Sequence, residues 1–290
     1  MNPPTDRVFP PRVSPTVSRV TDIKRVAIST GGGDAPGLNA VIRSVTLASR
    51  NRGWDVVGIR DGFNGLMFPD DYSDGGLIDL TRDSVRGISH LGGTIIGSTN
   101  RGNPIAYPTE QPDGTWVEVD RTDELLGKFD AAGIDALITV GGDGSLTIGN
   151  HLHRHGLRVI GVPKTIDNVL DKTTATFGFD TAVDFATECI DRQFTTATSH
   201  GRIIVVEVMG RYAGWIALHA GMAAGAHSIL IPEIPFDLEP VAETIRQREE
   251  HGSRFSIVVV AEGAIPVGGE ISTIGMSIGQ AVQLGGIGGK

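Results

Sequence analysis

Cysteine is almost absent from this chain, since Cys189 is the only one among 290 residues. A lone cysteine cannot form a disulfide within the chain, and no Cys/His spacing typical of a zinc site occurs. Long apolar runs are lacking too. The longest, such as residues 203–206 and 257–261, fall far short of the roughly 20 residues that a membrane-spanning helix needs. We therefore expect a soluble, cytoplasmic protein with no membrane partner.

Runs of basic residues are also missing. The chain carries 25 Lys and Arg against 34 Asp and Glu, a formal net charge of −9. Nucleic acids and anionic membranes bind to basic stripes, so we expect no nucleic-acid partner. Apolar residues make up 40% and charged residues 20% of the chain, a balance typical of a globular protein with a sizeable core.

Glycine, with 40 residues, is abundant, and most glycines stand singly or in pairs just after short apolar runs. These runs alternate with longer amphipathic stretches, which predicts βαβ units around a parallel sheet whose strands are mostly buried on both faces. We expect strands over residues 25–29, 56–59, 136–140, 159–162, 203–208, 228–231 and 256–260, and helices over residues 38–52, 122–132, 146–155, 181–195, 213–223 and 238–251.

Three other segments stand out in the pattern. Residues 1–23 contain five prolines and no apolar core, so we expect a disordered N-terminal tail rather than a signal peptide. Residues 106–121 are rich in turn formers and predict an irregular excursion with a small hairpin. Asp237 is the expected N-cap of the last helix, and Gly252 its stop.

Two glycine loops follow expected strands. GGGDAPGLNAVIR begins at Gly31, and its glycines let backbone N–H groups approach an anion at a helix N-terminus. It matches neither the Walker A pattern nor GxGxxG, so a phosphate site and a plain tight turn both remain open. VGGDGS places Asp143 among glycines, where a carboxylate suits Mg²⁺; the alternative is a capped turn.

Three further loops carry polar groups at strand ends. GVPKTIDN offers Lys164 for a phosphate, Thr165 as a hydroxyl and Asp167 as a base, a set that fits phosphoryl transfer; the alternative is a polar loop with a surface salt bridge. In VEVMGRYAGW, Arg211 suits a phosphate or a developing negative charge. Glu262 closes a further strand, in a position for sugar hydroxyls.

These loops together resemble the 6-phosphofructokinases. The motifs GGDAPGLNAVIR, GGTIIGS, GGDGS, PKTIDN, VEVMGRYAGW and AEG follow in that order from about Lys24 to about Gly263. The resemblance implies two Rossmann-like three-layer α/β/α domains with mainly parallel sheets and the active site in the cleft between them. It implies a phosphoryl-donor domain over residues 24–178 and a fructose 6-phosphate domain over residues 179–290. The implied reaction phosphorylates the 1-hydroxyl of fructose 6-phosphate to fructose 1,6-bisphosphate in glycolysis.

The resemblance also assigns roles to residues. Asp167 would be the catalytic base, assisted by Thr165, Lys164 and Arg211, and Asp143 would hold Mg²⁺. Arg202, in SHGR, is similar to an arginine that family members lend across a subunit interface, which implies a homo-oligomer, a tetramer or a dimer. The donor site would comprise Gly33, Asn100, Arg101, Gly142, Asp143, Gly144 and Ser145, and the fructose 6-phosphate site Thr165, Asp167, Arg202, Met209, Gly210, Arg211 and Glu262.

Two residues point to different phosphoryl donors. Gly144 is typical of family members that use ATP, because pyrophosphate users usually carry Asp there, which would crowd the nucleotide. Lys164 is typical of pyrophosphate users. The chain resembles a mixed type with GGDGS and PKTIDN that generally uses ATP, so ATP is the expected donor and pyrophosphate the alternative.

Three features depart from the family pattern. Val169 stands where a further acidic residue is common, and Asn100 stands where many members have Arg, with Arg101 one step later. The sequence stops at Lys290, before the segment with which the family grips the sugar 6-phosphate. We therefore expect a C-terminally truncated second domain, and a ligand-binding subunit without turnover is a further alternative.

Overall fold

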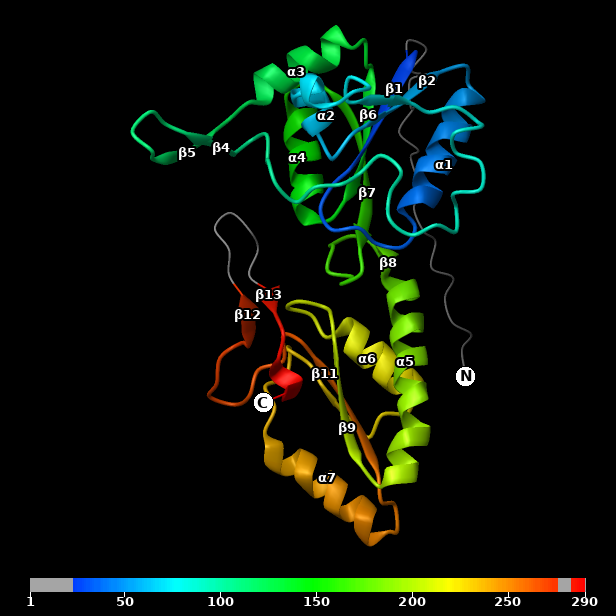
Figure 1. Cartoon of the computed structure of the whole chain (residues 1–290), viewed down its shortest axis with the longest axis vertical. Helices are drawn as coiled ribbons and strands as arrows, with labels where there is room; N and C mark the ends of the chain where they lie inside the picture. Colours follow the sequence, from blue (N-terminus) through cyan, green and yellow to red (C-terminus); the bar gives the residue numbers. More distant parts are fainter. Residues whose placement is uncertain (1–22, 276–282, 290) are drawn as a thin grey trace, which may run out of the picture.

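The computed structural model describes residues 23–275 and 283–289. The expected tail, residues 1–23, lies outside the described residues except for Ile23. Two sheets, one above the other in Figure 1, form the molecule, and the long helix α5 (Phe179–His200) runs down from the first sheet along the second. The expected mixed α/β fold with mainly parallel sheets is confirmed.

The first sheet has six strands in the order β3-β2-β1-β6-β7-β8. All neighbours pair in parallel except the edge strand β3, which runs antiparallel to β2. Ala27 of β1 belongs to one apolar cluster with helices on one face, and its neighbour Ile28 belongs to the cluster on the other face. The strands are β1 (Arg25–Thr30), β2 (Asp55–Ile59), β3 (Leu77–Asp79), β6 (Ala136–Gly141), β7 (Arg158–Thr165) and β8 (Phe177–Gly178).

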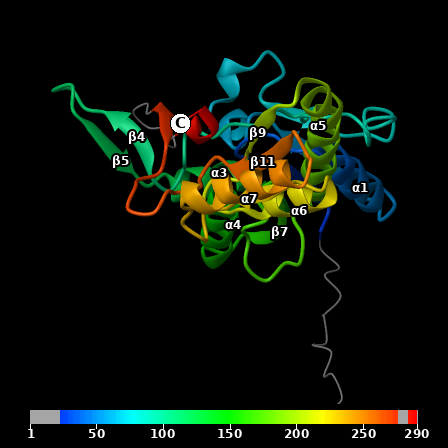
Figure 2. The ribbon, with the colours of Figure 1, turned by 90° about the horizontal axis from the view of Figure 1, so that it is seen from below.

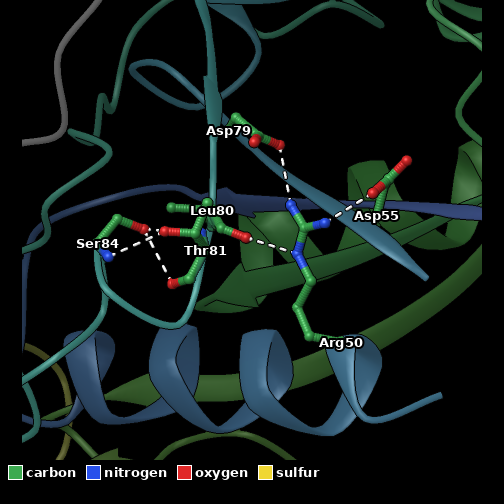
Figure 3. A network of polar contacts seen from close by, with 6 residues as sticks. All are labelled: Arg50, Asp55, Asp79, Leu80, Thr81 and Ser84. Atoms are coloured by element: carbon green, nitrogen blue, oxygen red, sulfur yellow. Dashed lines mark hydrogen bonds and ion pairs between the residues drawn. The ribbon is translucent and has the colours of Figure 1, made fainter. Parts of the chain in front are cut away.

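Helices cover both faces of this sheet. Helix α1 (Leu38–Arg50) packs on one face, while α2 (Asn64–Met67), α3 (Thr122–Ala131) and α4 (Asp143–Arg154) supply residues to the cluster on the other. A short 3-10 helix, Pro69–Asp71, follows α2. The outermost strand is tied to α1 by Arg50, which donates to Leu80 O and pairs with Asp55 and Asp79 (Figure 3).

A β-hairpin projects from the side of the first sheet. Strands β4 (Tyr107–Glu110) and β5 (Trp116–Val119) pair antiparallel, which confirms the small hairpin expected over residues 106–121. Both views show it extending away from the body of the molecule (Figures 1 and 2). At its base, the Arg121 guanidinium lies 4.8 Å from the centre of the Tyr107 ring, which anchors the arm.

The second sheet has three parallel strands in the order β10-β11-β9. Helices α5 and α6 (Trp215–Ala223) pack against it with small residues such as Ala197 and Ala220. Helix α7 (Leu238–Glu250) begins as expected, because the Asp237 side chain accepts the Glu239 N–H. The strands are β9 (Ile203–Val208), β10 (Ser228–Leu230) and β11 (Ser256–Ala261).

The chain ends beside the second sheet. Strands β12 (Thr273–Gly275) and β13 (Gln283–Leu284) pair antiparallel, and a 3-10 helix, Ile287–Gly289, follows them. Glu207 of β9 accepts N–H groups from Gly286 and Gly288, both at 2.8 Å. These bonds fasten the glycine-rich segment to the sheet.

Two expectations about these elements need correction. Burial on both faces holds for β11 but is wrong for β9, where Ile203 and Val205 face outward because α5 and α6 cover only the opposite side. Ile160 of β7 is likewise exposed. Helix α4 begins at Asp143, three residues before the expected start, because Gly142, directly after β6, is extended and accepts the first helical hydrogen bond, from Leu146 N.

Candidate active site

The carboxyl ends of β1, β6 and β7 open onto a cavity of about 590 Å³. Met209 and Arg211, which follow β9 of the second sheet, also line it, so the cavity lies between the two sheets. This is the position in which open parallel sheets bind ligands. Its lining comprises residues 31–35, 62–63, 99–104 and 164–167 together with Ser29, Thr139, Gly142, Gly144, Ser145, Ile148, Met209 and Arg211.

The first glycine loop is fixed by its own backbone. Gly31 N donates to Val140 O at 3.0 Å, and Gly32 N donates to Thr99 O at 2.9 Å. A Cβ at Gly31 would come within 2.5 Å of the Ser145 hydroxyl, so a larger residue there would displace the Ser145 side chain of helix α4. A Cβ at Gly33 would meet nothing within 4 Å, which shows that the loop turns an open side to the cavity.

Helix α4 presents its N-terminal turn to the same cavity. Gly142, Gly144 and Ser145 line the cavity. Helix α4 is 12 residues long, and the free N–H groups of its first turn carry a partial positive charge that attracts anions. The side chain of Asp143 is exposed and is not part of the lining. A Cβ at Gly144 would meet no atom within 4 Å, so a side chain there would extend into free space.

Lys164 connects β7 to the glycine loop. Only 4% of this residue is exposed, and its Nζ donates to Gly33 O at 2.5 Å. Burial lowers the pKa of the Lys164 ammonium, while the nearby carboxylates of Asp34 and Asp167 oppose this shift. The Lys164 Nζ is thereby held within the wall of the cavity.

Asp167 lies on the loop after β7 with its carboxyl group in the cavity wall. Its pKa is raised by burial and by the charge of Glu262, whereas Arg211, Thr165 and Lys164 counteract the shift. The Asp167 N–H donates to the Thr165 hydroxyl at 3.2 Å, which holds the turn. A carboxylate with a raised pKa takes up a proton more readily than an ordinary one, as a general base requires.

The loop after β9 is held by Glu262, which follows β11. One oxygen of Glu262 accepts N–H groups from Gly210 at 3.1 Å and from Arg211 at 2.8 Å. Gly210 has a φ of 145°, which glycine adopts without strain, whereas Arg211 has a φ of 51°, which is strained for a residue with a side chain. The Glu262 carboxylate stabilises this turn. Met209, 60% exposed, and Arg211 reach the cavity from this loop.

The structure therefore brings most of the expected site residues together, but not all. Four of them do not line the cavity. Gly210 and Glu262 support the Arg211 loop from behind, Asp143 lies beside Gly142 and Gly144, and Arg202 is exposed at the opposite end of β9. The expected residues that line it are Gly33, Asn100, Arg101, Gly142, Gly144, Ser145, Lys164, Thr165, Asp167, Met209 and Arg211.

Other lining residues were not expected from the sequence. Asp34 belongs to a motif that the sequence singles out, so its place after Gly33 was a usable signal. Ser29 and Thr139 lie inside strands, Ile148 lies in α4 and Phe63 lies just before α2. At such positions the sequence predicts core residues rather than site residues. Only the stacking of helix on sheet shows that they reach the cavity.

The described residues contain no group of three or more His, Cys, Asp and Glu side chains able to hold a metal ion. Mg²⁺ commonly uses one or two carboxylates and takes its remaining ligands from water and phosphates, so the exposed carboxylate of Asp143, next to Gly142 and Gly144, is a ligand of the kind that such an ion uses. None of the helices described is long and apolar enough to cross a membrane.

Known proteins are similar to this chain in sequence and in fold. The family model described as phosphofructokinase matches residues 25–285. The chain is 49% identical over 271 residues to ATP-dependent 6-phosphofructokinase 2 of Clostridium perfringens, covering 92% of this chain and 72% of that protein. It is 50% identical to ATP-dependent 6-phosphofructokinase of Chloroflexus aurantiacus, covering 91% of this chain and 70% of that one.

Solved structures agree with the sequence comparison. Pichia pastoris phosphofructokinase in the T-state superimposes with a TM-score of 0.74 at 34% identity, covering 86% of this chain and 27% of that one. Pyrophosphate-dependent phosphofructokinase from Marinobacter aquaeolei gives a TM-score of 0.68 at 27% identity, covering 84% and 62%. The chain thus spans less than two thirds of either solved chain. Because the family model matches residues 25–285, the chain belongs to the phosphofructokinase family.

Proposed function

We propose that this chain transfers the terminal phosphoryl group of ATP to the 1-hydroxyl of fructose 6-phosphate, giving fructose 1,6-bisphosphate and ADP. The proposal rests mainly on Asp167. Its carboxyl group has a raised pKa, and the residue lines the same cavity as the glycine loops at Gly31 and Gly142. Relatives about 50% identical are named ATP-dependent 6-phosphofructokinase, which supports the same reaction.

The chemistry follows from the residues around the cavity. Asp167 accepts the proton of the sugar 1-hydroxyl while that oxygen bonds to the terminal phosphorus of ATP. The bond from this phosphorus to the bridging oxygen breaks, and ADP leaves with the electron pair. Lys164, Arg211 and the N-terminus of α4 face the cavity and offset negative charge on the transferred group. Thr165 lies between the base and the lysine in the chain, in position to contact the sugar.

Asp143 is the proposed Mg²⁺ ligand. It is the first residue of α4, next to Gly142 and Gly144, and its exposed carboxylate would hold the ion. When bound there, Mg²⁺ would supply charge neutralisation for the donor phosphates. Gly33, Asn100, Arg101 and the α4 turn would form the rest of the donor site.

The sugar side is assigned to residues of both sheets. Thr165 and Asp167 at the end of β7, together with Met209 and Arg211 after β9, are the proposed fructose 6-phosphate residues that line the cavity. Gly210 and Glu262 belong to the same proposed site and hold the Arg211 loop. Arg202 lies at the far end of the six-residue strand β9 from Arg211, so it cannot serve the same cavity. It would act in the cavity of a neighbouring subunit, within a dimer or tetramer. The division at residues 24–178 and 179–290 is part of this proposal.

ATP is the proposed donor because of Gly144. A side chain there would extend into free space next to the glycine loops, where the phosphates of a nucleotide would lie. Lys164 is the residue that favours pyrophosphate, and its Nζ already donates to Gly33 O. The lysine therefore fixes the loop in addition to any contact with the donor.

The test compares the two donors directly. Fructose 1,6-bisphosphate formation is measured from fructose 6-phosphate and Mg²⁺, with ATP and pyrophosphate supplied in parallel to the wild-type chain and to Gly144→Asp. We expect turnover with ATP, and a strongly raised KM for ATP in the variant. Turnover with pyrophosphate alone would contradict the assignment of the donor.

A further inference from the structure

Thr139 is a buried polar side chain without a polar partner. It lies on β6 with an exposed fraction of 1%. Within the described parts of the chain, its hydroxyl is the only buried side-chain polar atom that makes no hydrogen bond. Such a group lowers stability unless a ligand or a water molecule pairs with it, so its presence calls for an explanation.

The surroundings of Thr139 place it at the cavity. Its sheet neighbours are Ser29 on β1 and Gly161 on β7, and it forms part of the cavity wall. A Cβ at Gly149 of helix α4 would come within 2.7 Å of the Thr139 methyl carbon, so the methyl group occupies the helix side. The hydroxyl takes another position on Cβ. Ser29 does not satisfy it, because the Ser29 hydroxyl donates to Gly62 O at 3.0 Å.

The cavity wall has two chemically different parts. The glycine loops, the first turn of α4 and Lys164 present N–H donors, which suit phosphates. Around Thr139 the wall is neutral and partly apolar: Phe63 belongs to the apolar core, Ile148 packs against that core, and Ser29 bonds to Gly62. This second part suits an uncharged group with a few polar atoms.

We propose that Thr139 determines donor specificity by a hydrogen bond from or to the nucleoside part of the phosphoryl donor. The inference rests on the proposed function and names a residue that the family motifs do not include. A nucleoside presents ring nitrogens, an amino group and ribose hydroxyls, each of which can pair with a threonine hydroxyl. Pyrophosphate has none of these groups, and its charged oxygens suit the glycine loops rather than the neutral part of the wall. Thr139 therefore favours a nucleotide over a bare phosphate chain.

The experiment measures binding in the presence of Mg²⁺ by calorimetry. The two ligands are a non-hydrolysable ATP analogue and tripolyphosphate, which carries the phosphates without the nucleoside. The proteins are the full wild-type chain, Thr139→Val and Thr139→Ser. Valine keeps the shape and removes the hydroxyl, whereas serine keeps the hydroxyl and removes the methyl group that faces Gly149.

We expect Thr139→Val to bind the ATP analogue about 3- to 10-fold more weakly, the effect of one lost hydrogen bond. Tripolyphosphate binding should stay within about two-fold, Thr139→Ser should keep the affinity for the analogue, and the Tm of Thr139→Val should equal or exceed that of the wild type. Unchanged analogue binding in Thr139→Val, or equal weakening of both ligands, would overturn the proposal.

The outcome is separable from that of the proposed function. If the wild type binds the analogue through Thr139 but forms no fructose 1,6-bisphosphate, the proposed reaction fails and the assignment of Thr139 stands. If the wild type turns over with ATP and Thr139→Val does so with an unchanged KM for ATP, the assignment of Thr139 fails and the reaction stands. Failure of the folded wild type to bind the analogue contradicts both.

Discussion

At the residue scale, the environment of Asp167 has opposite consequences for catalysis and for stability. Burial and the charge of Glu262 raise the pKa of Asp167 above its unfolded value. A carboxyl group of this kind adds to stability at a pH below its unfolded pKa, and that contribution is lost as the pH rises through its folded pKa. At neutral pH the ionised group therefore destabilises the fold.

Asp167→Asn removes this ionisation and keeps the shape of the side chain. We expect the variant to melt at a higher temperature than the wild type at pH 7, and the difference to shrink as the pH falls toward about 4, near the unfolded pKa of an aspartate. Thermal unfolding followed over this pH range measures it. The control Asp184→Asn, at an exposed position on α5, should show no such gain. An equal Tm for Asp167→Asn and the wild type at pH 7 would refute the argument.

Glu262 acts on the site through the Arg211 loop. Its carboxylate accepts two backbone N–H groups of a strained turn, so its removal leaves both donors without a partner. We expect Glu262→Ala to lose about 1–3 kcal/mol of stability and to raise the KM for fructose 6-phosphate. Glu262→Gln retains an acceptor oxygen and should lose less stability. Calorimetric unfolding of both variants measures this, and identical stability of alanine, glutamine and wild-type proteins would show that the bonds do not matter.

At the scale of elements, helix α7 depends on its ends. It has no buried residue, and the Asp237 side chain caps its first turn. We expect Asp237→Ala to cost about 1 kcal/mol within this helix, which corresponds to roughly five-fold faster amide hydrogen exchange there. Asp237→Asn preserves a capping oxygen and is the matched control. Unchanged exchange in α7 of the alanine variant would mean that packing, rather than the cap, holds the helix.

Element positions were largely predictable from the sequence, because apolar runs with flanking glycines define them. The strand expected over residues 203–208 has those bounds in the structure, and the N-cap at Asp237 is confirmed. The start of α4 was missed because Gly142 and Gly144 read as a loop, although Asp143 and Gly144 lie in its first turn. Local propensity does not show that the N-terminus of a helix can accommodate glycine.

The contacts within the site were less predictable. The sequence predicted Lys164 and Asp167 as site residues, because polar residues that directly follow parallel strands meet at one edge of a sheet. Nothing in the sequence showed that the Lys164 ammonium bonds to the Gly33 carbonyl, which lies 131 residues away in the chain. Nor could it show that Glu262 holds the N–H groups of Gly210 and Arg211, since that contact depends on the pairing of β9 with β11.

At the scale of the whole molecule, the position of Arg202 bears on assembly. It precedes β9, whereas Arg211 follows that strand, so the two arginines cannot serve one cavity within a subunit. We expect Arg202→Ala to weaken fructose 6-phosphate binding and Asp167→Asn to lower turnover by about 10²- to 10⁴-fold. In a co-expressed oligomer, the Asp167→Asn subunit would supply its Arg202 to the sugar-binding site of an Arg202→Ala partner, whose Asp167 is intact.

Mixed oligomers of the two variants should therefore regain activity with a wild-type KM for fructose 6-phosphate at some of their sites. The control is a mixture of the two purified proteins under conditions that prevent subunit exchange, which should stay inactive at low substrate. Activity of co-expressed oligomers no higher than that of the variants alone would show that Arg202 does not act across an interface.

The proposed role of Asp167 as the base for phosphoryl transfer to fructose 6-phosphate can be tested directly. The measurement is the rate of fructose 1,6-bisphosphate formation from fructose 6-phosphate and Mg²⁺-ATP by the wild-type chain and by Asp167→Asn. Loss of a general base lowers kcat by about 10²- to 10⁴-fold, and we expect a loss of this size with little change in the KM for ATP. Turnover by Asp167→Asn at the wild-type rate would contradict the account.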